Sequence, residues 1–198
     1  MIPLSHMTNG SSMYVEETLA MEQQDPLTCV SPSDFLRCLL PQECHLEEAN
    51  QGFSLDKRIP MDGYNMEVVN AIRSNDIAAL RFMLENGQNF NVCNANGEYL
   101  IHLASRRSSP DTVLFLIDEC NVNLDVRDTT GRSILHDICW KSSPDEEMMV
   151  TVLRRAPMHL LLSKDIRGHT PFDFARKHHW KQWLAFLKEH RDIIREKA

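Results

Sequence analysis

The sequence predicts an all-α solenoid of about four stacked helix-turn-helix units over residues 64–198. Three observations lead to this prediction. An eight-residue pattern recurs from Gly97, Gly131 and Gly168, so that successive copies begin 34 and 37 residues apart. Apolar residues between the copies follow a helical period, and polar, turn-forming residues precede each glycine. Repeats spaced by about 20–50 residues are typical of arrays whose units bury their apolar faces against each other.

The four units are placed at residues 64–96, 97–130, 131–167 and 168–198. Each offers a short helix, a turn and a second helix, followed by a polar loop that carries the next glycine. Pro171 suits the first turn of a helix, where its missing N–H costs nothing. The last unit is expected to cap the array with an inward stripe formed by Trp180, Trp183, Leu184 and Leu187.

The recurring octets resemble the ankyrin motif, G-x-T-P-L-H-x-A. They read GEYLIHLA from Gly97, GRSILHDI from Gly131 and GHTPFDFA from Gly168. The first two copies keep the histidine, as His102 and His136, but lack Thr-Pro, whereas the third keeps Thr-Pro. The resemblance covers residues 64–198. It implies an ankyrin-repeat solenoid with loop fingers, whose concave face of inner helices and loop tips binds a protein.

Neither catalysis nor metal binding is predicted. The resemblance implies that His102 and His136 order their turns through hydrogen bonds within and between units. A zinc site would need several converging Cys or His ligands, and no Cys pair has ligand spacing. Cys139 near His136 is interpreted as a packed core residue rather than a nucleophile. Without a phosphate-binding loop, no nucleotide or other cofactor is expected.

Residues 1–60 are predicted to be a largely disordered acidic region with a short helix at 33–40, N-capped by Ser33. Residues 1–62 carry three basic and ten acidic side chains, which accounts for the whole formal charge of −7. The helix contains an L-x-x-L-L pattern from Leu36 to Leu40. It could cover the exposed end of the first repeat or serve as a docking motif, and the acidic tail could occupy the concave groove in cis.

The candidate site follows from mapping the motif onto positions that packing leaves free. The residues expected to contact a partner are Arg73, Arg106, Arg107, Arg127, Asp128, Asp137, Trp140, Lys141, Arg167 and Lys177. Trp140 is the chief candidate, because Trp and Arg are enriched at binding hot spots. The alternative is that Trp140 is buried against residues 142–147. The basic residues around it favour an acidic, partly apolar peptide as the ligand.

These features predict an interaction module, a scaffold or adaptor, rather than an enzyme. The alternative is a substrate-recruiting adaptor of a modifying enzyme such as a ubiquitin ligase, docked through the N-terminal helix. No secretory signal or membrane span is evident, and the cysteines are scattered, so we expect a cytoplasmic or nuclear monomer with free thiols. Neither nucleic acid nor membrane is expected as a partner.

Overall fold

The computed structural model describes residues 30–40, 62–107, 109–141 and 143–197, without the side chain of Lys141. The chain divides into Met1–Val30 and Ser31–Ala198, and every element below belongs to the second unit. Its helices are α2 (Pro32–Leu39), α4 (Met66–Ser74), α5 (Ile77–Glu85), α6 (Leu100–Arg107), α7 (Pro110–Asp118), α8 (Ile134–Lys141), α9 (Glu146–Arg155), α10 (Trp180–Glu189) and α11 (Arg191–Lys197). Three short 3-10 helices join them: η1 (Met158–Leu161), η2 (Pro171–Phe174) and η3 (Lys177–His179). The described part contains no β-strand, and the predicted all-α class is confirmed.

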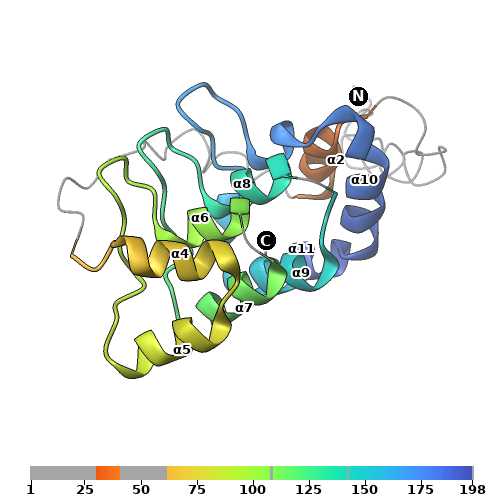
Figure 1. The fold of residues 1–198 in the computed structure, drawn as a ribbon. Helices are drawn as coiled ribbons and strands as arrows, with labels where there is room; N and C mark the ends of the chain where they lie inside the picture. The colour runs from red at the N-terminus through yellow and green to blue at the C-terminus, as the bar shows by residue number, and fades with distance from the viewer. Residues whose placement is uncertain (1–29, 41–61, 108, 142, 198) are drawn as a thin grey trace, which may run out of the picture. The chain divides into compact units, whose positions relative to one another are not determined.

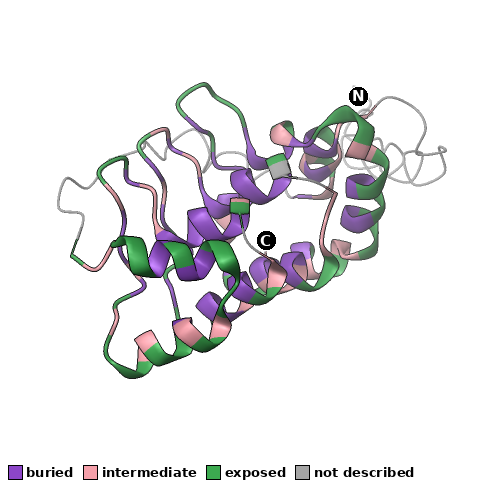
Figure 2. Cartoon of the chain, in the orientation of Figure 1, coloured by how far each residue is buried: buried purple, intermediate pink, exposed green. Residues whose placement is uncertain are grey.

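Two layers of helices form the array. The inner helices α4, α6 and α8 pack side by side, and the outer helices α5, α7 and α9 pack in the same order (Figure 1). Side-chain caps fix where several helices begin: Asn65, Asp76 and Asp145 accept hydrogen bonds from backbone N–H groups in the first turns of α4, α5 and α9. Figure 2 shows that α6 and α8, which have neighbours on both sides, are buried along most of their length.

The loops between units contact each other through their backbones. The N–H of Thr129 donates to the carbonyl of Asn96, and the N–H of Ile166 donates to the carbonyl of Thr130. Gly131 has a φ of +78°, a backbone conformation that residues with a side chain rarely adopt. A Cβ there would lie 3.3 Å from the Cα of Asp165 in the next loop. The glycine at this position therefore favours close stacking of the two loops, whereas a Cβ at Gly168 would meet no atom within 4 Å.

The two motif histidines lock neighbouring units together. The Nδ1 of His102 accepts a hydrogen bond from the N–H of Tyr99, and its Nε2 lies 3.1 Å from the carbonyl oxygen of Arg132. His136 repeats the arrangement with the N–H of Ser133 and the carbonyl of His169. Burial lowers the pKa of both imidazoles to about 4, so the neutral ring accepts at Nδ1 and donates at Nε2. The predicted structural role is confirmed.

The N-terminal helix covers the last unit, and the expectation that it covers the first is wrong. Helix α2 packs against η2, α10 and α11. Leu36 is 1% exposed there, and the hydroxyl of Ser33 lies 2.9 Å from that of Thr170. Ser31, rather than Ser33, is the N-cap, since its side chain accepts from the N–H of Asp34. Helix α2 thus packs against α10, whose buried residues include Trp183, Leu184 and Leu187.

The fourth unit departs from its neighbours at the position of its inner helix. Only the single 3-10 turn η2 forms there, followed after Ala175 by η3. Asp173 occupies the position of the motif histidine and accepts from the N–H and hydroxyl of Thr170, which closes a capping box. The carbonyl of Ala175 accepts a hydrogen bond from the indole N–H of Trp180. It is therefore not used to continue a helix. Most of residues 1–60, which the sequence predicts to be disordered, lies outside the described residues.

Candidate partner-binding site

Trp140 lies at the C-terminal end of α8 and is 49% exposed. The guanidinium of Arg176 lies over its ring, 5.3 Å from the centroid. The alternative that Trp140 is buried against residues 142–147 is therefore wrong. An indole held by a cation and open to solvent offers a large apolar surface without further ordering. We call the exposed surface of α4, α6, α8 and η2–η3 that surrounds it the inner-helix face.

Arg106 links this face to the buried layer beneath it. Its guanidinium pairs with Glu98 and, at 3.2 Å, with the Oδ1 of Asp137. Asp137 is only 2% exposed, and burial raises its pKa to about 7 against the opposing effect of Arg106. Asp137 was expected at the surface, but its helix position turns it under Arg106, where it supports that side chain.

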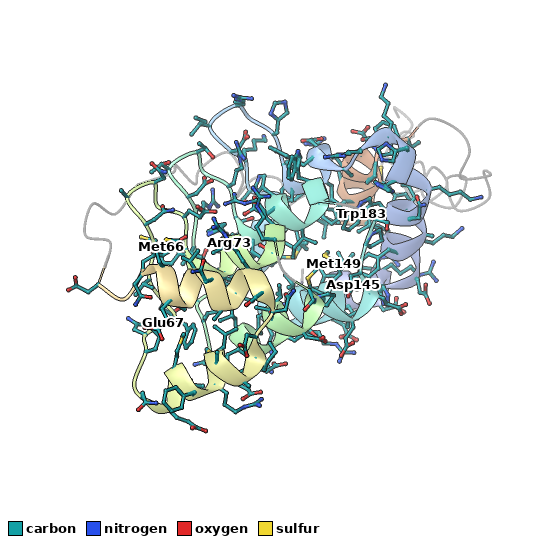
Figure 3. All side chains as sticks on the ribbon, in the orientation of Figure 1. Met66, Glu67, Arg73, Asp145, Met149 and Trp183 are labelled. Atoms are coloured by element: carbon teal, nitrogen blue, oxygen red, sulfur yellow. The ribbon has the colours of Figure 1, made fainter. Side chains whose placement is uncertain are left out.

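Arg73 and Arg107 lie on the inner helices α4 and α6. Arg73 is exposed on α4, on the helix that also carries Met66 and Glu67 in Figure 3. Arg107 is exposed at the end of α6. Burial raises the pKa of the half-buried Tyr64, whose hydroxyl bonds to Asn94, while the charges of Arg73 and Arg106 act in the opposite sense. The structure thus brings Arg73 and Arg106 near one phenol.

The other predicted contacts divide between η3 and the loops. Lys177 is exposed, with its Nζ 5.9 Å from the ring centroid of Trp180, and the side chain of Lys141 lies outside the described part. Arg167 is exposed at its loop tip, and Arg127 is half-buried. Asp128 is buried, because one carboxylate oxygen accepts from the N–H groups of Thr130 and Arg132 and so holds the loop closed.

The comparison with known protein families agrees with this geometry. Residues 68–155 match the family model for ankyrin repeats in three copies, and this range spans helices α4 to α9. Residues 68–155 are ankyrin repeats. No curated protein matches the sequence.

Two residues of the inner-helix face were not predicted from the sequence. Arg132 follows the motif glycine of the third unit, and its guanidinium lies 5.7 Å from the ring centroid of Phe174. Arg176 precedes η3 and stacks on Trp140. A position in the repeat motif predicts which side chain faces outward. It does not predict which Arg or Lys side chain contacts an aromatic ring of a neighbouring unit. The only available signal was the departure of the fourth octet from the histidine consensus.

The structure also shows the surroundings of the residues considered for catalysis and metal binding. Cys93 and Cys139 of the ankyrin core are fully buried, and burial raises the pKa of both thiols. Within the described ranges, no three His, Cys, Asp or Glu side chains converge in a way that could hold a metal ion. None of the helices there is both long and apolar enough to cross a membrane.

Proposed function

We propose that this ankyrin array is a scaffold or adaptor module that binds an acidic, partly apolar segment of a partner protein on its inner-helix face. Ankyrin repeats are in general protein–protein interaction modules. The observation that carries the proposal is the exposed indole of Trp140 beneath Arg176 on a face formed by the inner helices. Hot-spot residues of this type supply most of the binding free energy of an interface.

The charges of the inner-helix face favour an acidic partner. Among its carboxylates, Glu98 and Asp137 are engaged by Arg106, Asp173 accepts from Thr170, and Glu67 is exposed on α4. The remaining cations make no ion pair with another described residue; they are Arg73, Arg107, Arg176 and Lys177. A surface with excess positive charge attracts an acidic segment and raises its association rate, while Trp140 supplies apolar contact.

The test uses the full-length chain as bait for a displayed library of random twelve-residue peptides. We expect the selected peptides to be enriched in Asp and Glu together with apolar residues. Trp140→Ala should weaken their binding by about 2 kcal/mol or more, roughly thirtyfold. The matched control is Phe82→Ala, which removes an aromatic side chain that is 67% exposed on the outer helix α5.

Both variants should keep the helical circular dichroism and melting temperature of the parent, because each removes an exposed side chain. Peptides without acidic enrichment, or equal loss of binding in both variants, would count against the proposal. Arg106 is unsuitable for this test, because its removal would also leave the buried carboxylate of Asp137 without its partner.

The alternative function, a substrate-recruiting adaptor of a ubiquitin ligase, has weaker support. It requires the L-x-x-L-L helix to dock on another protein. Leu36 is buried against the fourth unit and Leu40 is 6% exposed, so such docking would first have to detach α2. Substitution of Leu36 therefore tests stability as well as recruitment.

A further inference from the structure

A small pocket opens on the inner-helix face beside Trp140. Its volume is about 90 Å³, and its lining comes from α6, the loop before α8, α8 itself and η2. The lining residues are Arg106, Arg132, His136, Asp137, Trp140 and Phe174. The pocket exists where the fourth unit has only a 3-10 turn in place of an inner helix. Its aromatic side chains, Trp140 and Phe174, come from α8 and η2.

Two polar groups of this pocket lack hydrogen-bond partners within the described part of the chain. The Nε of Arg132 is buried without a hydrogen-bond partner, while the guanidinium lies over the ring of Phe174 and its charge acts on Asp137. The Oδ2 of Asp137 is also buried without a partner, since Arg106 bonds to the other oxygen. Buried polar groups are normally satisfied, so unsatisfied ones beside an open pocket point to a ligand.

We propose that this pocket binds the carboxylate of one Asp or Glu side chain of the partner segment, with Arg132 as its principal ligand. A guanidinium offers paired donors that match a carboxylate, and Arg132 is the one guanidinium of the lining with no described ion-pair partner. The methylene groups of the bound side chain pack on Trp140 and Phe174. The inference rests on the proposed function and names the anchor of that interface.

The charges around the pocket decide which ligand it accepts. The lining holds two guanidinium groups against one carboxylate, so it favours an anion over a cation. The neutral form of Asp137 is accessible near neutral pH because burial raises its pKa to about 7. A ligand carboxylate nearby would raise that pKa further, and Asp137 would take up a proton from solvent on binding.

Binding should therefore weaken as pH rises through neutrality. The charged or titratable groups that face Asp137 from the surrounding elements are Arg106 on α6, with Glu98 behind it, Asp128 and Arg132 in the loop, and His136 on α8. His136 is neutral over this range, since its pKa is about 4. Arg176, over Trp140, adds a fixed positive charge.

The test is an NMR titration of the full-length protein with N-acetylglutamate N-methylamide and, separately, its glutamine analogue. We expect the glutamate probe to shift the Arg132 side-chain and Trp140 indole resonances with a Kd on the order of 1 mM. The glutamine probe should not saturate them. Arg132→Gln should weaken glutamate binding about tenfold or more, whereas Arg154→Gln, which changes an exposed side chain of the outer helix α9, should leave it unchanged.

The pH arm compares the parent with Asp137→Asn. Glutamate affinity should fall several-fold between about pH 6 and pH 8 in the parent, and this dependence should disappear in the variant. Equal binding of the two probes, or equal loss in the Arg132 and Arg154 variants, would overturn the proposal.

The two proposals fail in distinguishable ways. If the library selects no acidic peptide while the glutamate probe still shifts Arg132, the pocket stands and the proposed function falls. If acidic peptides bind but Arg132→Gln holds them as tightly as Arg154→Gln, the proposed function stands and the pocket assignment falls.

Discussion

The ionisable residues between units act on stability in opposite directions. His102 and His136 have folded pKa values of about 4, against an ordinary value of 6.5. Between these values the unfolded chain binds their protons and the folded chain does not, so their effect is to lower the free energy of unfolding as pH falls. Asp137, with a folded pKa of about 7 against 3.8, binds its proton first in the folded chain and opposes this trend.

Removing Asp137 should therefore make the protein more sensitive to acid. We expect the free energy of unfolding of Asp137→Asn to fall more steeply than that of the parent, by roughly 1.4 kcal/mol per pH unit between about pH 6 and 4.5. Urea denaturation at a series of pH values measures the slope. His102→Gln should change the slope by a similar amount in the other direction. Identical slopes in parent and variants would show that these groups are not perturbed by folding.

Arg106 should be required mainly because Asp137 lies beneath it. Arg106→Ala leaves a buried carboxylate without its ion pair, and we expect a loss of about 2–3 kcal/mol at pH 8. The loss should shrink at pH 6, where Asp137 can take up a proton. The double variant Arg106→Ala/Asp137→Asn should recover part of the stability, as chemical denaturation would show. Additive losses in the double-mutant cycle would mean that the pair is not coupled.

At the scale of elements, α2 should stabilise the array as a cap for its last unit. Leu36→Ala removes a side chain that is 1% exposed, and we expect the free energy of unfolding to fall by about 3 kcal/mol. Cys38→Ala provides the control, because Cys38 is exposed on the same helix. Urea denaturation of both variants makes the comparison. Equal stabilities would mean that α2 is not docked in solution.

The repeated helices were predictable from sequence, whereas the ends of the array were not. Glycine spacing and the two histidines predict α6 to α9, because each repeat there contacts only neighbours of the same kind. The docking of α2 on η2 includes a contact between Ser33 and Thr170 that no local pattern encodes. The same limit applies to the site: the position of Trp140 was predictable, but its stacking with Arg176 depends on the irregular fourth unit.

The whole array should differ in stability from one end to the other. A repeat array is stabilised by its interfaces, so a unit with one neighbour opens more readily than one that is covered. Helix α2 covers the fourth unit. In the first unit, by contrast, Met66 is 65% and Phe82 67% exposed. The first unit should therefore open before the last.

Native-state hydrogen exchange can measure this order of opening. We expect the amides of α4 and α5 to exchange through openings of lower free energy than the amides of α10, although both groups of helices lie at ends of the array. In Leu36→Ala, protection of α10 should fall while that of α4 stays unchanged, because the substitution acts on an interface that α4 does not share. A uniform fall in all helices would instead show that the array opens only as one cooperative unit, with α2 contributing to its global stability.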